Sequence, residues 1–208
     1  MRCKLYYVHD PMCSWCWAFS PVYEQIVQRL PGNVQLITLL GGLAPDSSEP
    51  MPQAMQEFLQ TTWKKITERV PGTQFNFDFW SQCQPRRSTY PACRAIIAAR
   101  AQDVKHESAM IKAIQQAYYL RAMNPSDDET LLTLAIELGL DTEQFASLLN
   151  AAATQQQLER EIELGRSIGA EGFPSLILEC NGQLHRLRYS YTDPAPVLAQ
   201  IESLIGPG

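Results

Sequence analysis

The sequence has no long hydrophobic run, no excess of positive charge and no regular cysteine framework. No stretch of about 18 apolar residues occurs, so the sequence predicts no membrane-spanning helix. The 208 residues carry 17 Lys and Arg against 22 Asp and Glu, which gives a net charge of −5. Because a nucleic-acid or anionic-membrane surface requires a basic patch, we expect neither kind of partner.

A secretory signal pattern is also missing from the start of the sequence. Such a signal combines an apolar stretch of about 7–15 residues with a small-residue cleavage site. Here residues 1–4 lead directly into the short apolar run 5–8. We therefore expect a cytoplasmic protein.

The six cysteines, at positions 3, 13, 16, 83, 93 and 180, show no framework spacing. A chain of this length buries enough surface to fold without disulfides, and cytoplasmic thiols are kept reduced. We expect Cys3 and Cys180, each in an apolar run, to be small buried core residues with free thiols.

The strongest signal is the pair Cys13 and Cys16, which are separated by Ser14 and Trp15. The pair follows a predicted strand over 5–8 and precedes an amphipathic segment that reads as a helix to about residue 30. A thiol at a helix start faces unpaired backbone N–H groups and the positive end of the helix dipole, which stabilise the thiolate. We predict that Cys13 is the nucleophile and that Cys16 resolves the mixed disulfide.

The remaining chain predicts an α/β unit interrupted by a helical block. A second strand over 34–40 should lie parallel to the first, because βαβ crossovers are right-handed, and this places the cysteines at a carboxyl strand end. Helical patterns fill residues 51 to about 168. Strand signals return over 173–179, followed by an Asn181-Gly182 hairpin turn, a partner strand over 184–191 and a last helix.

This order resembles the thioredoxin fold with a large α-helical insertion, as in the DsbA family. It is most similar to the cytoplasmic FrnE-like branch, which contains predicted protein-disulfide isomerases. Three segments carry the resemblance: 10–17 (Asp-Pro-Met-Cys-Ser-Trp-Cys-Trp), 88–95 (Ser-Thr-Tyr-Pro-Ala-Cys-Arg-Ala) and 172–175 (Gly-Phe-Pro-Ser). The resemblance implies a discontinuous thioredoxin-like domain over 1–42 and 169–208, with the insertion over 43–168.

The resemblance also implies an activity and a substrate site. The activity is thiol–disulfide exchange on protein or peptide disulfides, without a bound cofactor or metal and with glutathione as a candidate co-substrate. In the family the proline that faces the dithiol is cis, a place that falls to Pro174 here. The backbone of Phe173 would offer strand-like hydrogen bonds to an extended substrate, and Ser14 and Trp15 complete the expected substrate-binding set.

Two departures from the family pattern have consequences. Tyr7 stands where thioredoxin and DsbA carry a buried carboxylate, so the proton route would pass to His9, to Asp10 or to solvent. Ser14-Trp15 replaces the Pro-His of strong oxidants, and Trp cannot stabilise the reduced thiolate as His does. We expect a more reducing potential than that of DsbA, which favours reductase or isomerase work.

Three alternatives are open for the dithiol. A structural zinc site needs a second ligand pair at comparable spacing, whereas Cys83 and Cys93 are ten residues apart. A glutathione-dependent isomerase or transferase of the kappa-class or hydroxychromene-carboxylate isomerase type shares the architecture but lacks the resolving thiol. A non-catalytic thioredoxin-like binding module would need neither Cys13 nor Cys16.

Three further groups of residues each allow two interpretations. Cys93 is either a third reactive thiol or a buried helix-packing residue. Arg86, Arg87 and Arg94 either attract an acidic ligand such as glutathione or form a solvated surface. The aromatic residues of the insertion either line a peptide groove or form a core; they are Trp63, Phe75, Phe77, Phe79 and Trp80.

Overall fold

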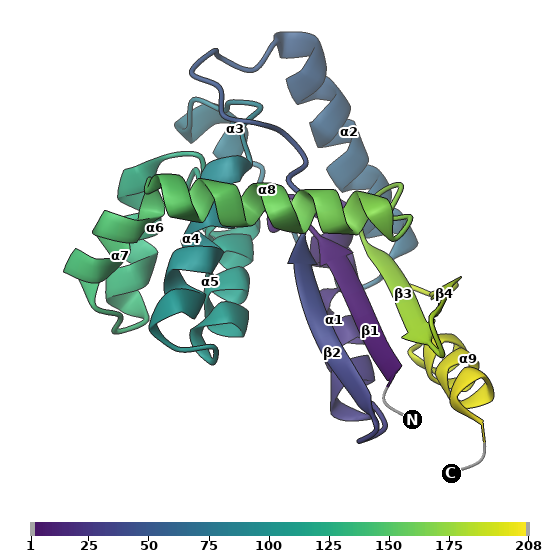
Figure 1. Ribbon diagram of the computed structural model, residues 1–208. Coiled ribbons are helices and arrows are strands. Elements are labelled where there is room, and N and C mark those ends of the chain that lie inside the picture. Colours follow the sequence, from purple (N-terminus) through teal and green to yellow (C-terminus); the bar gives the residue numbers. More distant parts are fainter. Residues whose placement is uncertain (1–2, 207–208) are drawn as a thin grey trace.

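The computed structural model describes residues 3–206 and contains a four-stranded mixed sheet with helices on both faces (Figure 1). The strands are β1 (Cys3–His9), β2 (Val34–Leu40), β3 (Ser175–Cys180) and β4 (Gln183–Arg186). They lie in the order β2-β1-β3-β4, with β2 parallel to β1, and with β1/β3 and β3/β4 antiparallel. This is an α/β thioredoxin fold with a helix-rich insertion, as predicted.

Helix α1 (Ser14–Gln28) covers one face of the sheet together with α9 (Ala195–Ile205). Phe19, Val22 and Ile26 recur at helical spacing, are buried and pack in one cluster with β1 side chains such as Leu5. Burial of this apolar stripe fixes α1 against β1. The turn between the two elements, which carries the dithiol, is therefore anchored on both sides.

Helix α8 (Ala152–Ser167) lies across the opposite face, at the carboxyl ends of β1 and β2 (Figure 1). A Cβ at Gly165 would lie 3.1 Å from a methyl carbon of Val8, so glycine allows the close approach of α8 to β1. The buried side chain of Glu161 accepts a hydrogen bond from the Leu40 amide at 3.1 Å. Through these contacts α8 connects the insertion to the sheet.

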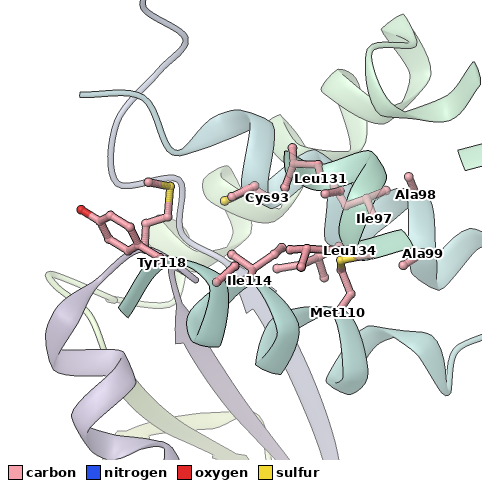
Figure 2. Close-up of a cluster of buried hydrophobic side chains, with 14 of the residues drawn as sticks. Cys93, Ile97, Ala98, Ala99, Met110, Ile114, Tyr118, Leu131 and Leu134 are labelled. Atoms are coloured by element: carbon pink, nitrogen blue, oxygen red, sulfur yellow. The ribbon is translucent and has the colours of Figure 1, made fainter. Parts of the chain in front are cut away.

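The insertion is built around α4 (Tyr90–Gln102), whose residues 91–99 are all buried. Small alanine side chains allow neighbouring helices to pack around it. Figure 2 shows the apolar cluster in which α4 meets α5 (His106–Leu120) and α6 (Asp128–Glu137). The other helices of the insertion are α2 (Gln53–Arg69), α3 (Phe79–Gln82) and α7 (Thr142–Leu149).

One local expectation was wrong. The hairpin turn at Asn181-Gly182 is present, but β4 ends at Arg186 rather than at residue 191. The proposed division into residues 1–42 with 169–208 and residues 43–168 stays a prediction.

Among residues 3–206, no helix combines the length and apolar character needed to cross a membrane.

The expectation that Cys3 and Cys180 carry free thiols was also wrong, because they form a disulfide. The residues are buried, as expected, with 3% of each exposed. The physical reason is strand register: Lys4 pairs with Glu179 across β1 and β3, so the next two residues outward are Cys3 and Cys180. Their Cα atoms are 4.7 Å apart, within the range that a disulfide spans.

Candidate active site

The turn between β1 and α1 presents Cys13 and Cys16. Cys13 is the N-cap residue of α1, with φ −80° and ψ 116°, and its carbonyl accepts a hydrogen bond from the Trp17 amide at 3.0 Å. Cys13 is 8% exposed, whereas Cys16 is fully buried one turn further along the helix. A substrate can therefore reach the Cys13 sulfur, and Cys16 can be reached only by way of Cys13.

The second half of the site lies at the entry to β3. The peptide bond between Phe173 and Pro174 is cis, as the resemblance implies, and the Cys13 thiol donates to the Phe173 carbonyl at 3.6 Å. A Cβ at Gly41 would lie 1.9 Å from the Phe173 ring, so only glycine leaves room for that ring. Sequence reasoning missed Gly41, since nothing in the chain links it to Phe173 before folding.

The two thiols differ in acidity. A hydrogen bond from the Cys16 thiol, aided by the backbone amides of Cys16 and Trp15, lowers the pKa of Cys13 against the opposing effect of burial. Burial raises the pKa of Cys16 well above its ordinary value, and the neighbouring Cys13 raises it further. Cys13 is thus the more acidic thiol of the pair, in line with its position at the helix start.

Asp10 ties the dithiol turn to the insertion. Its buried carboxylate accepts hydrogen bonds from the Met12 amide at 2.8 Å, the Leu43 amide at 2.7 Å and the Thr89 hydroxyl at 2.7 Å. The Cys93 thiol donates to the same carboxylate at 3.7 Å. Burial raises the pKa of Asp10, and these four donors act against that rise.

Cys93 is a buried packing residue of α4 rather than an accessible third thiol. It is fully buried, and burial, followed by the charge of Asp10, raises the pKa of its thiol well above the ordinary value. A neutral, enclosed thiol is a poor nucleophile. Its role in the site is the hydrogen bond that it gives to Asp10.

His9 lies beneath the site without a hydrogen-bonding partner for either ring nitrogen among residues 3–206. Its ring stacks on Tyr7 at 4.9 Å with an interplanar angle of 4°. Burial lowers the pKa of His9 to about 3, so the imidazole stays neutral at physiological pH. The structure therefore places Asp10, and not His9, in hydrogen-bond contact with the residues around the dithiol.

A cavity of about 640 Å³ opens beside Cys13. Its walls include Ser14, Trp15 and Phe173, which are three of the predicted substrate-binding residues. Phe58 and Leu59 of α2 line the same cavity. Since Phe58 is 63% exposed, the entrance carries an uncovered apolar side chain.

The aromatic residues of the insertion form a core. Trp63 and Phe79 are each 1% exposed, and the Trp63 ring stacks on Phe75 at 4.9 Å and packs against Trp80 at the same centroid distance. Only Trp63 among the five aromatics also lines the cavity beside Cys13. Phe75, Phe79 and Trp80 therefore belong to this core, whereas Phe77 packs against Trp63 and is 37% exposed.

The three arginines of the possible acidic-ligand site do not act together. Arg94 is buried and pairs with Asp46 at 2.7 Å, away from the cavity beside Cys13. Arg86 lines the cavity but pairs with Asp127 at 2.6 Å. Arg87 lines the cavity as well. Within residues 3–206, no group of three or more His, Cys, Asp or Glu side chains is placed to hold a metal ion.

Alkylation of the reduced protein by iodoacetamide is expected to show the acidity of Cys13. Its rate should rise with pH about a midpoint below the roughly 8.5 of an ordinary thiol, because the thiolate is the reactive form. In Asp10→Asn the midpoint should move lower still, since the carboxylate charge raises the pKa of Cys13. Mass spectrometry of the Cys13 peptide measures both, and a wild-type midpoint at or above that of free cysteine would contradict the prediction.

The geometry agrees with a match to a protein family. The model of the family described as DSBA-like thioredoxin domain matches residues 5–199. This span includes the dithiol, the insertion and the cis proline.

Solved structures with the same fold cover nearly the whole chain. A protein from Nitrosomonas europaea, named provisionally as a protein disulfide isomerase, has a TM-score of 0.85 and 23% identity, over 99% of this chain and 98% of that one. The cytosolic disulfide reductase DsbM from Pseudomonas aeruginosa has a TM-score of 0.79 and 25% identity, over 97% and 98%. A structure of DsbM with GSH has a TM-score of 0.76 and 24% identity, over 97% and 98%.

The curated relatives are longer than this chain. The ClpXP adapter protein SpxH from Bacillus subtilis (strain 168) is 24% identical over 174 residues, which are 83% of this chain and 57% of SpxH. The chain thus spans less than three fifths of the length of that relative.

Proposed function

The chain belongs to the DSBA-like thioredoxin domain family, and we propose that it is a thiol–disulfide oxidoreductase that reduces protein or peptide disulfides through Cys13 and Cys16. One observation carries the proposal. An acidic, reachable thiol at a helix start lies over a buried, less acidic one and faces the carbonyl of Phe173. This asymmetry is what attack and resolution require.

The reaction proceeds in two exchanges. The Cys13 thiolate attacks one sulfur of the substrate disulfide, which breaks the S–S bond and expels the other sulfur as a thiolate. Cys16 then loses its proton and attacks the Cys13 sulfur, which forms the Cys13–Cys16 disulfide and expels the second substrate thiolate. The substrate gains two electrons from the dithiol, and its two thiolates take up the proton released by Cys16 and one proton from solvent, which received a proton when Cys13 ionised. An external thiol must return the dithiol to its reduced form.

For the proton of Cys16 we propose a route by way of Asp10 or solvent rather than His9. The charge of Asp10 acts on both thiols, and its pKa is raised by burial. The imidazole of His9 stays neutral, and neither of its ring nitrogens has a hydrogen-bonding partner within the described part of the chain. For the substrate we propose that Phe173, Pro174, Ser14 and Trp15 hold an extended segment against Cys13.

The direction and the surroundings of the reaction are part of the proposal. Ser14-Trp15 between the cysteines provides no cation to stabilise the reduced thiolate as the His of strong oxidants does, which favours a reducing potential and reductase or isomerase work. The likeness to a cytosolic disulfide reductase, solved also with GSH, supports a cytoplasmic reductant with glutathione as co-substrate.

The proposal is tested with insulin and with scrambled ribonuclease. Wild-type protein should accelerate insulin reduction by dithiothreitol. Cys16→Ser should accumulate a mixed disulfide between Cys13 and substrate, because no second thiol can release it. Peptide mapping by mass spectrometry locates the bond, and recovery of active ribonuclease separates isomerase from reductase work. Wild-type protein without activity on either substrate would contradict the proposal.

The alternative function, a glutathione-dependent isomerase or transferase, predicts a different result for the Cys16→Ser variant. It requires a single reacting group at position 13, so conjugating turnover would survive in Cys16→Ser. The buried Cys16 directly behind Cys13 favours the dithiol reaction instead.

A further inference from the structure

Three cationic side chains from separate segments line the cavity beside Cys13. They are Lys65 on α2, Arg87 in the segment before α4 and Arg166 on α8. None of the three forms an ion pair with another residue of the described range 3–206. The cavity wall therefore carries three positive charges that no acidic side chain of the described residues pairs with.

The other charged residues of the cavity wall do not offset this charge. Arg86 pairs with Asp127 at 2.6 Å, and Glu171 pairs with Arg186 at 2.6 Å. Among residues 3–206, no other acidic side chain lines the cavity. The chain has 22 acidic residues and a net charge of −5. The cavity beside the reactive thiol is nevertheless positively charged.

We propose that this cavity selects disulfides that carry carboxylates next to the sulfur, with Lys65, Arg87 and Arg166 as the carboxylate-binding residues. The proposal rests on the proposed thiol–disulfide exchange and adds the class of substrate. A concave site lined by one sign of charge concentrates ligands of the opposite sign. Arginine also binds carboxylates through paired, directional hydrogen bonds.

The position of the cavity fits this role. A substrate sulfur at Cys13 places the neighbouring residues of the segment in the cavity that Lys65, Arg87 and Arg166 line. Glutamate and aspartate side chains of a polypeptide and the two carboxylates of glutathione share this chemistry. Only Arg87 of the three arginines that the sequence singled out belongs to the set, because Lys65 and Arg166 join it through folding.

The experiment uses the reduced full-length protein and disulfide-linked peptide dimers in which Cys is flanked by Glu, Ser or Lys. Oxidised glutathione is a fourth substrate. For each disulfide, the second-order rate constant with which it oxidises the protein is divided by the rate constant with which it oxidises dithiothreitol. The quotient corrects for differences in intrinsic reactivity between the four disulfides. The wild-type protein should favour Glu-flanked over Lys-flanked peptide at least about tenfold at low salt, and much less at about 0.5 M NaCl.

Two triple variants carry the same change in composition and charge. Lys65→Gln/Arg87→Gln/Arg166→Gln should bring the normalised Glu-to-Lys ratio close to one. Lys64→Gln/Arg160→Gln/Arg188→Gln removes three exposed cations that do not line this cavity and should keep the wild-type ratio. A merely long-range effect of net charge would change both variants equally.

The outcomes separate this proposal from the one on which it rests. The carboxylate site is overturned, while exchange activity stands, if the first triple variant changes neither the Glu-to-Lys ratio nor the normalised rate with oxidised glutathione. Absence of exchange with all four substrates overturns both proposals. If only oxidised glutathione loses rate in the first variant, the ligand is glutathione; if the Glu-flanked peptide loses rate, the ligand is an acidic polypeptide segment. Either loss supports the site.

Discussion

Replacing Cys13 by serine is expected to lower the rate of insulin reduction by a factor on the order of a thousand or more. Serine keeps the size of the side chain and its place at the start of α1, but its hydroxyl does not ionise near neutral pH and cannot form a mixed disulfide. Cys16 does not replace it, because Cys16 is fully buried and its pKa is raised well above the ordinary value. The initial rate of insulin precipitation measures the loss.

Cys83→Ser is the matched control for this prediction. Within residues 3–206, two free cysteines lie outside the dithiol, Cys83 and Cys93, and only Cys83 is partly exposed. Its thiol donates to the Ala122 carbonyl at 3.0 Å. The same chemical change there should leave the rate within about twofold, since surface substitutions away from a site have small effects. Equal rates in Cys13→Ser and wild type would overturn the assignment of the nucleophile.

The sequence was sufficient for the first half of the site. Cys13 and Cys16 are near neighbours, and strand, turn and helix signals around them suffice to place the first thiol at a helix start. Pro174 could be named only through the resemblance, because the contact between Cys13 and the preceding Phe173 spans 160 residues. Local pattern carries no information on which distant segment meets the dithiol.

The contacts that surround the dithiol could not be predicted for the same reason. Asp10 was singled out because it is close to Cys13 in sequence, yet its partners are distant in the chain: Leu43 follows β2, and Thr89 and Cys93 lie at the start of α4. His9 was singled out on equal grounds, but the pleat of β1 turns its ring away to stack on Tyr7. Proximity in sequence was the same for both; the side of the strand decided their roles.

Loss of the Cys3–Cys180 disulfide is expected to lower the free energy of unfolding by about 2–5 kcal/mol. The bond links residues 177 apart, so it closes a loop of nearly the whole chain and restricts the unfolded state strongly. Without it, β3, β4 and α9 are held to β1 by strand pairing and apolar packing alone. Equilibrium unfolding in urea of Cys3→Ala/Cys180→Ala against wild type measures the difference.

Reductant supplies the control for this second prediction, because it acts on the bond and not on the packing. Both proteins are first unfolded in dithiothreitol, which lets the reductant reach the buried disulfide, and are then refolded in its presence. Under these conditions their free energies of unfolding should be nearly equal. Equal stability already without reductant would contradict the prediction. The double variant should keep the exchange rate of its folded molecules, because Cys3 begins β1 and the dithiol follows the opposite end of that strand. The disulfide at the start of β1 would then contribute to stability, and the dithiol beyond the end of β1 would carry the exchange reaction.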